Sequence, residues 1–415
     1  MDNLAPWATL HHCMTNISNM RQRLLILFTL SIAMTSCHVG RFFLYNFSDI
    51  RDYRKFPAAE VARGSEVFTF ADGRKADHGL TLPGTWPVKD KARPFAEALD
   101  KSKTVAFLVI RNDSILYDWY GNGYNRESIV TSFSVVKSVV SALMGIAIDE
   151  GYVGSVSDPI TNYLPYLDES EFAPITIAHL LDMESGIAFQ ESYYSPFSDA
   201  AKFYYGRRLD KYLTKLEVER PPGEGFRYKS INTLLLAQII EATTKMPLSE
   251  YLSTRLWQPM DTEFSASLSL DREGGTAKAF AGLNGRAIDF AKFGRLYLNR
   301  GRWEDEQIVP AYWVDRSTDN LDGDSFRKYR YQWWHPRYYQ TYQETETYSE
   351  PYRLISGEDG TRYVLKPVDY YSATGHLGQY IAVLPQDRMI VVRFGKKKGH
   401  LDWYRLFQWI AEHNG

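Results

Sequence analysis

The stretch Ser134-Val-Val-Lys-Ser-Val-Val-Ser-Ala-Leu-Met-Gly-Ile-Ala147 decides how the rest of this sequence is interpreted. Its larger apolar side chains recur at the spacing of a helix, at Val135, Val139, Leu143 and Ile146. Several other residues of the stretch are small, so such a helix can pack closely against its neighbours; they are Ser138, Ser141, Ala142, Gly145 and Ala147. The pattern predicts a helix over residues 134–150 that is buried in the middle of the fold and ended by Gly151.

Ser134 and Lys137 lie in the first turn of this predicted helix. A serine hydroxyl is a poor nucleophile at neutral pH and needs a base within hydrogen-bond reach. A lysine three positions later lies on the same helix face, and partial burial lowers the pKa of its amine so that it can accept the serine proton. The N-terminus of the helix would also favour a developing oxyanion. The pair is a candidate nucleophile and base, with an ordinary helix-capping serine as the alternative.

The Ser-x-x-Lys spacing alone is not sufficient, because it recurs at Ser325-Phe-Arg-Lys328. That copy has polar, loop-like neighbours, and we interpret it as solvated surface. Two later motifs support the first copy: Tyr228-Lys-Ser230 before a predicted helix, and Gly375-His-Leu-Gly-Gln379 before a predicted strand. Taken singly, Tyr228 could be a core tyrosine and His376 a turn residue.

Strand patterns occur at both ends of the chain, and the middle is mostly helical. Residues 105–110 and 115–120 are β-rich runs separated by a polar turn, which predicts a hairpin. Further strands are predicted at 331–334, 379–384 and 389–394, followed by an amphipathic helix at 403–413. The sequence therefore predicts an α/β (α+β) fold, in which an antiparallel sheet built from both chain ends is flanked by helices and carries an inserted all-helical lobe.

These patterns divide the chain into three segments. Residues 1–37 are interpreted as a signal peptide with a possible lipobox, and 38–95 as an N-terminal extension with a strand candidate at 67–70. The main domain is predicted over 96–415, with its helical lobe at about 155–290. Within it, the Tyr- and Glu-rich stretch 338–352 is predicted to be a long surface loop.

The beginning of the chain has the pattern of an export signal. Arg21 and Arg23 precede an apolar run of about 12 residues, which is too short to span the roughly 30 Å of bilayer hydrocarbon. The run ends at Met34-Thr-Ser-Cys37, which resembles a bacterial lipobox with Cys37 as the lipidated residue. A plain cleaved signal or a short retained anchor is the alternative. We expect translation to start at Met20 and the product to be a periplasmic, membrane-anchored bacterial lipoprotein.

The composition excludes several classes of function. The 415 residues carry a formal net charge of −2, without the basic excess that nucleic-acid binding requires. The nine His show no metal-ligand spacing, and the Gly-x-Ser-x-Gly motif of an α/β-hydrolase is absent from the sequence. With Cys13 and Cys37 as the only Cys, a start at Met20 leaves no disulfide within the mature chain. We expect no metal, no cofactor and no nucleic-acid partner.

Together, the three motifs resemble those of the serine β-lactamase and penicillin-binding-protein superfamily, on its class C side. The resemblance covers residues from about 95 to 410, with the motifs in the order that this superfamily has. It implies that Ser134 is the nucleophile and Lys137 its base partner. It also implies that Tyr228 hydrogen-bonds this pair and relays the proton to the leaving group.

The resemblance further implies substrate-binding and oxyanion positions. The backbone N–H groups of Ser134 and Gln379 would form the oxyanion hole, and Gly378 would keep the strand edge open to substrate. Two positions depart from the class C pattern: Ser230 stands where those enzymes hold Asn, and His376 where a β-lactamase holds Lys. That Lys helps to bind the antibiotic's carboxylate, so both departures argue against an efficient β-lactamase.

The resemblance therefore implies a serine hydrolase that cleaves a small ester or amide through an acyl-enzyme. It is similar to the 6-aminohexanoate-dimer hydrolases and the carboxylesterases of the superfamily. The alternatives are a penicillin-binding, D-alanyl-D-alanine-peptidase-like protein with slow or no turnover, and a catalytically inactive scaffold. The expected partner is a small ester, amide or peptide substrate.

Overall fold

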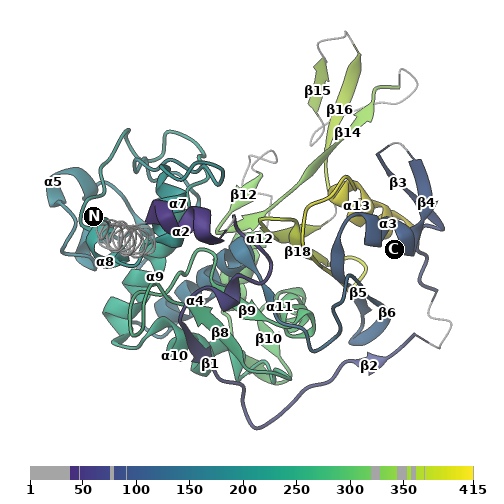
Figure 1. Cartoon of the computed structure of the whole chain (residues 1–415), viewed down its shortest axis with the longest axis horizontal. Helices are drawn as coiled ribbons and strands as arrows, with labels where there is room; N and C mark the ends of the chain where they lie inside the picture. Colours follow the sequence, from purple (N-terminus) through teal and green to yellow (C-terminus); the bar gives the residue numbers. More distant parts are fainter. Residues whose placement is uncertain are drawn as a thin grey trace, which may run out of the picture.

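The centre of the structure is a sheet assembled from both ends of the chain. The computed structural model describes residues 38–45, 47–74, 79–89, 91–318, 328–343, 353–356, 361–368 and 370–414. The sheet has the strand order β12-β13-β17-β18-β19-β5-β6-β2. Its bounds are β2 (Ala71–Asp72), β5 (Thr104–Arg111), β6 (Ser114–Tyr120), β12 (Tyr329–Arg330), β13 (Trp333–Trp334), β17 (Tyr371–Gly375), β18 (Gln379–Leu384) and β19 (Met389–Gly395). β19 pairs with β5 in antiparallel fashion, so the chain ends meet in mid-sheet and the predicted architecture is confirmed (Figure 1).

Both faces of this sheet are covered. Successive side chains of β5 alternate between the faces, so Phe107 and Val109 join one hydrophobic cluster while Leu108 and Ile110 join the other. Residues of α3 (Phe95–Lys101) and α13 (Trp403–Asn414) complete the first cluster, and residues of α4 (Val136–Asp149) and α11 (Ala287–Leu298) the second. In Figure 1 the sheet lies between these two helix pairs. The result is a helix–sheet–helix arrangement with α4 deep inside.

A mainly helical lobe lies beside the sheet, on the left of Figure 1. Its helices are α5 (Glu169–Phe172), α6 (Ile177–Leu181), α7 (Asp199–Tyr205), α8 (Leu209–Leu213), α9 (Ser230–Thr244) and α10 (Leu248–Leu252), with a π-helical turn over Ser253–Trp257. The predicted lobe range also contains two short strands, β8 (Ala266–Ser269) and β9 (Leu283–Gly285), which the helical spacing did not indicate. They pair with each other and with strands from outside the lobe, and such distant pairing leaves no local periodicity.

The N-terminal extension is joined to the rest of the molecule. β1 (Ala58–Val61) pairs with β8, and β7 (Val130–Thr131) closes the same four-stranded sheet. The strand predicted at 67–70 is wrong, because the structure assigns no strand there. Its aromatic residues pack instead of pairing: the ring of Phe68 contacts those of Phe70 and Trp303 edge-on. The remaining elements are α2 (His38–Tyr45), β3 (Thr85–Val88), β4 (Lys91–Pro94), β10 (Arg302–Trp303), β11 (Glu306–Gln307) and α12 (Ala311–Thr318).

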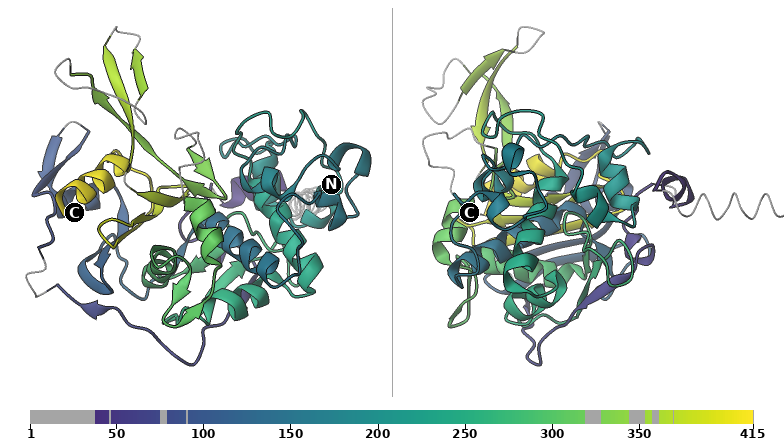
Figure 2. Two further views of the ribbon diagram at one scale, coloured as in Figure 1. Left: turned by 180° about the vertical axis from the view of Figure 1, so that it is seen from behind. Right: turned by 90° about the vertical axis from the view of Figure 1, so that its left-hand side faces the viewer.

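The stretch 338–352 was predicted to be a surface loop, and its first part is not. β14 (Arg337–Thr341) pairs with β16 (Arg362–Pro367), which also pairs with β15 (Arg353–Ser356). These three strands stand out from the body of the molecule (Figures 1 and 2). The Tyr- and Glu-rich composition concealed a strand because its partner lies about 25 residues further along the chain. Residues 344–352 lie outside the described ranges.

Candidate active site

Ser134 lies at the entrance to α4, in the 3₁₀ turn η2 (Phe133–Val135). Phe133 has a φ of 47°, which lies in the left-handed region that residues other than glycine rarely adopt. Lys137 follows on the first turn of α4, and its Nζ donates a hydrogen bond to Oγ of Ser134 at 3.0 Å. The two residues that the Ser-x-x-Lys spacing singled out are therefore in direct contact.

The amine of Lys137 is held inside the protein, since the residue is 1% exposed. Besides Ser134, Nζ donates to Oγ of Ser230 at 3.2 Å and to the carbonyl oxygen of Phe280 at 2.7 Å. Burial lowers the pKa of Lys137 to about 7, against an opposing effect of the Glu191 charge. At neutral pH a large share of the amine is therefore neutral, which is the form that can accept the serine proton.

Glu191 was not singled out from the sequence, and it completes this network. Its carboxylate accepts the backbone N–H of Ser230 at 2.7 Å, the hydroxyl of Ser230 at 2.6 Å and the hydroxyl of Tyr193. Since Ser230 also contacts Lys137, the carboxylate is linked to the amine through one hydroxyl. The residues around Glu191 form no motif, and only its tertiary contacts identify it.

Tyr228 lies above the Ser134–Lys137 pair. Its hydroxyl is hydrogen-bonded to Ser134, and Nζ of Lys137 lies 5.2 Å from the centre of its ring. Trp334 stacks on the ring at 5.8 Å, which fixes its orientation. Burial, the charge of Glu191 and the bond to Ser134 act together on the phenol, and the net effect raises the pKa of Tyr228 above 10. The hydroxyl therefore stays protonated and is placed to donate or relay a proton.

The His376-Leu-Gly378 turn connects β17 to β18 beside the nucleophile. Gly375 and Gln379 face each other across this turn, and a Cβ on Gly375 would lie 2.5 Å from the carbonyl oxygen of Ser132 and 3.3 Å from the backbone nitrogen of Ser134. The turn therefore approaches the backbone of η2 closely. The side chain of Gln379 is held within the sheet by bonds to the backbone of Gly395, and the residue is buried at the start of β18, opposite Gly375.

Arg393 holds this turn from behind. Its buried guanidinium donates to the carbonyl oxygens of Leu377 (2.9 Å) and Gly378, and also to those of Ser102 (2.9 Å) and Lys397 (2.8 Å). Leu377 and Gly378 have φ values of 62° and 79°; glycine adopts this left-handed conformation freely, whereas Leu377 needs such support to keep it.

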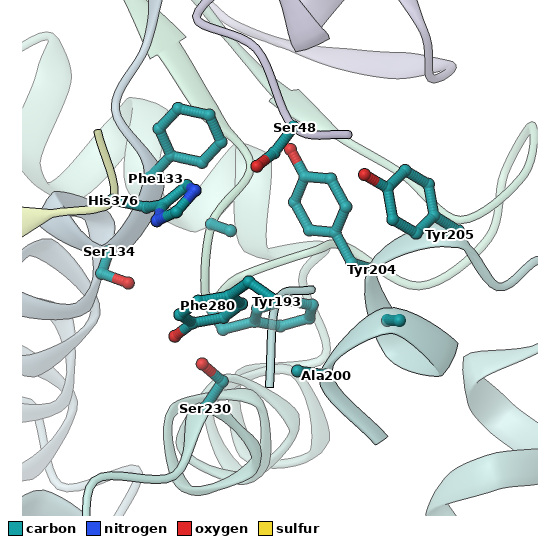
Figure 3. A pocket seen from close by; sticks show the side chains of 12 residues that line it. Ser48, Phe133, Ser134, Tyr193, Ala200, Tyr204, Tyr205, Ser230, Phe280 and His376 are labelled. Carbon is teal, nitrogen blue, oxygen red and sulfur yellow. The ribbon is translucent and has the colours of Figure 1, made fainter. Parts of the chain in front are cut away.

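A small pocket opens in front of Ser134. Figure 3 shows the hydroxyls of Ser134 and Ser230 and the ring of His376 facing it, with Tyr204 and Tyr205 on the opposite side. Burial lowers the pKa of His376 below 6.5, so this imidazole is neutral at pH 7. The residues that line the pocket are Ser48, Phe133, Ser134, Tyr193, Ala200, Ala201, Tyr204, Tyr205, Ser230, Phe280, Ala281 and His376. No Lys, Arg, Asp or Glu is among these described residues.

Two further polar residues of the lobe take structural roles, and two positions singled out from the sequence lie outside the described ranges. His179 closes a capping box with Thr176 at the start of α6, and Asp182 accepts the backbone N–H of Tyr331. Cys37 and Ser325 fall on residues that are not described. Within the described part of the chain, no group of three His, Cys, Asp or Glu side chains could hold a metal ion.

Comparisons with known proteins agree with this geometry. The family model described as beta-lactamase matches residues 92–413. A curated 6-aminohexanoate-dimer hydrolase from Paenarthrobacter ureafaciens is 31% identical over 260 residues, which are 57% of this chain and 66% of that protein. The match therefore spans slightly under two thirds of the length of that relative.

Two solved structures share the fold. A provisionally named 6-aminohexanoate-dimer hydrolase from Bacillus anthracis superposes with a TM-score of 0.71 at 22% identity, covering 90% of this chain and 94% of the other. A provisionally named beta-lactamase from Bacteroides dorei superposes with a TM-score of 0.57 at 18% identity, covering 76% and 96%. At these identities the superpositions show the fold alone. The family match covers most of the chain and, together with the curated relative, shows the family and the class of enzyme: this chain belongs to the beta-lactamase family and is a serine hydrolase.

Proposed function

We propose that the chain hydrolyses a small, uncharged ester or amide through an acyl-enzyme on Ser134. The contact that carries this proposal is the 3.0 Å hydrogen bond between Ser134 and a Lys137 whose pKa burial lowers to about 7. Oγ of Ser134 attacks the substrate carbonyl carbon while its proton passes to Nζ of Lys137. The carbonyl oxygen becomes negative, and the backbone N–H groups of Ser134 and Gln379 would stabilise it.

The bond to the leaving group then breaks. The proton on Lys137 reaches the departing alcohol or amine through the hydroxyl of Tyr228, which is hydrogen-bonded to Ser134. Water completes the cycle: it gives a proton to Lys137 as its oxygen adds to the acyl carbon. The bond from Oγ of Ser134 to that carbon breaks, and Oγ takes the proton back. The products are a carboxylic acid and an alcohol or amine.

The pocket lining favours an uncharged substrate. No charged side chain is among the described residues that line it, and neutral His376 stands where a cation would bind a β-lactam carboxylate. Aromatic rings and alanines make up most of the wall, which suits an apolar acyl or alcohol group. The similarity to a 6-aminohexanoate-dimer hydrolase supports small amides as a second substrate class.

The test is hydrolysis of p-nitrophenyl acetate and of short N-acyl amides by the full chain. Ser134→Ala should lower kcat/KM by at least about 10³-fold, as for other nucleophile deletions. Ser141→Ala is the matched control, since Ser141 is buried on the same helix and does not line the pocket. Turnover by Ser134→Ala at the wild-type rate would rule the proposal out. Stable labelling by a fluorescent penicillin without ester turnover would favour a penicillin-binding protein instead.

We also propose that the mature chain is exported and anchored through lipid on Cys37. The support is the apolar run followed by Met34-Thr-Ser-Cys37. In the described part of the chain, no helix has the length and apolar character needed to cross a bilayer. Wild-type protein should fractionate with membranes and carry a lipid mass on Cys37, and Cys37→Ser should lose that mass. A mature wild-type chain with unmodified Cys37 would contradict the proposal.

A further inference from the structure

The most exposed large hydrophobic side chains of the described residues gather on one part of the surface. They are Phe197 (78% exposed), Tyr194 (77%), Leu44 (61%) and Phe43 (60%), and Phe47 (47%) lies beside them in the sequence. We call these five residues the aromatic patch. Soluble proteins rarely leave several large apolar side chains of this exposure together, so the patch calls for a partner.

The members of the patch come from two segments that are distant in the sequence and neighbours in the fold. α2 packs alongside α7, and Figure 1 shows the two helices next to each other. Phe42 of α2 contacts the ring of Tyr205 at 5.4 Å, and Nε of Arg41 donates to the carbonyl oxygen of Tyr205 at 2.5 Å. At the other end of α2, the His38 side chain is hydrogen-bonded to the backbone of Pro196. α2 and the loop before α7 therefore lie side by side, and each of them carries exposed apolar side chains.

The two segments that carry the patch, residues 38–48 and 192–198, contain no acidic residue, although Asp49, Glu191 and Asp199 follow or precede them directly. The basic groups of Arg41 and Lys202 lie close enough to His38 to lower its pKa, together with burial. Asp199, the first acidic residue after the loop, lies 3.9 Å from Lys202. An apolar surface whose two segments contain no acidic residue, with basic groups beside them, suits the interface of a membrane that contains anionic lipid.

The chain that precedes the patch indicates which partner covers it. α2 begins at His38, directly after Cys37 and two residues after the end of the apolar run Leu24–Thr35. Whether lipid on Cys37 or the run itself enters the bilayer, α2 has no linker that could carry it away from the membrane surface. This argument favours a membrane over a second copy of the chain as the partner, because the preceding segment places α2 at a bilayer.

The patch is also next to the active-site pocket. Ser48 lines the pocket three residues after α2 ends, and Tyr193 and Ala200 line it on either side of the Tyr194–Phe197 loop. The patch and the pocket mouth are thus built from the same two segments.

We propose that the aromatic patch docks on the bilayer surface, so that the pocket receives ester or amide substrates that are amphiphiles held in the membrane. The substrate assignment rests on the hydrolytic activity proposed above, and the docking rests only on the proposed membrane attachment before His38. The ring edges and Leu44 would enter the interfacial region, and the substrate's apolar tail would remain in lipid while its carbonyl reaches Ser134.

The docking is tested by hydroxyl-radical footprinting of the full chain on vesicles of phosphatidylethanolamine and phosphatidylglycerol. Tyr312, 51% exposed on α12, is an internal reference of the same chemistry as Tyr194. Exposure alone predicts faster oxidation of Tyr194. Docking predicts the reverse order on vesicles, with Phe197 protected too. Faster oxidation of Tyr194 on vesicles would overturn the proposal, as would protection that is lost when the protein is diluted at constant lipid, which indicates a second copy.

The substrate class is tested with a double variant, Leu44→Ser/Phe197→Ser, and with Tyr312→Ser as its matched control. The double variant should hydrolyse vesicle-embedded p-nitrophenyl palmitate about tenfold more slowly, since two interfacial anchors are lost. Hydrolysis of soluble p-nitrophenyl acetate should not change, and Tyr312→Ser should match wild type on both esters. Equal rates on the embedded ester would overturn the substrate assignment. If the wild-type protein hydrolysed neither ester while Tyr194 and Phe197 were still protected on vesicles, the proposed hydrolytic function would be refuted and the docking would stand.

Discussion

At the scale of single residues, the buried amine of Lys137 governs the chemistry. Because burial lowers its pKa to about 7, the neutral, proton-accepting form grows as the pH rises through that value. We predict that kcat/KM for a short ester increases from pH 5.5 to 8.5 with a midpoint near 7. The measurement is a pH–rate profile. His376→Gln is the control, because burial lowers the pKa of His376 and this residue is the other group in the pocket that could titrate in the acidic part of the range. A flat profile, or a midpoint that disappears in His376→Gln, would contradict the assignment of Lys137 as base.

Glu191 provides a second prediction at this scale. Its negative charge favours the protonated form of Lys137, so Glu191→Gln should lower the pKa of that amine further and move the midpoint to lower pH. Its weaker hydrogen bonds to Ser230 should also reduce kcat/KM about tenfold. Tyr193→Phe removes one bond to the carboxylate but keeps the charge, and its midpoint should stay near that of wild type. A midpoint that rises in Glu191→Gln would show that the carboxylate does not act on Lys137.

The contrast between Lys137 and Glu191 shows what the sequence could reveal about the site. Ser134 and Lys137 are three positions apart, so helix geometry brings them together, and the spacing predicted the contact that the structure shows. Glu191 reaches Ser230 from a loop about 40 residues away, and no local pattern encodes that approach. Tyr228 and His376 needed the resemblance to a known family as well as their own neighbours.

At the scale of elements, the left-handed turn between β17 and β18 depends on Arg393. The guanidinium bonds to four backbone carbonyls, and lysine has neither the planar fork nor the reach to replace it. We predict that Arg393→Lys destabilises the protein by about 1–3 kcal/mol. It should also lower kcat more than it changes KM, since the turn positions the backbone of Gln379. Thermal unfolding and steady-state kinetics measure both effects, with the exposed Arg388→Lys as control; an unchanged kcat would contradict this positioning role.

The elements that could be predicted are those with a strong local period. α4, β5, β6, β18 and β19 fall within a few residues of the predicted ranges, because buried apolar side chains repeat at helix or strand spacing. The predictions for residues 67–70 (a strand) and 338–341 (a loop) were wrong, because strand propensity alone does not determine whether a segment pairs with another strand. Aromatic residues of high strand propensity pack without pairing in the first case, and a polar, Tyr-rich run pairs with a distant strand in the second.

At the scale of the whole molecule, the N-terminal extension forms part of the pocket. Asp52 is buried and accepts the hydroxyl of Tyr204 at 2.5 Å, and it lies 2.6 Å from Nζ of Lys55. Tyr204 lines the pocket but does not touch the nucleophile in the contacts described here. We predict that Asp52→Ala destabilises the protein by about 1–3 kcal/mol and raises KM more than it lowers kcat. Denaturant unfolding and steady-state kinetics measure the two effects. An unchanged KM would show that the N-terminal extension does not influence substrate binding in the pocket.

The architecture of the whole molecule, a sheet built from both chain ends with a helical lobe, followed from the order of strand and helix patterns in the sequence. The pairing of β1 with β8 and the position of α2 against α7 could not be predicted, because both join segments about 160 to 210 residues apart through contacts without sequence periodicity. Those two contacts bring the extension to the pocket.

The central claim is that Ser134, activated by Lys137, carries the acyl group. Rapid mixing of the full chain with p-nitrophenyl acetate, acid quenching, and peptide mass spectrometry test it most directly. The account predicts an added acetyl mass on the peptide that contains Ser134, formed at a rate that rises with pH through about 7, and none in Ser134→Ala. An acetyl group on any other residue during turnover, or full turnover with no acyl-enzyme on Ser134, would contradict it.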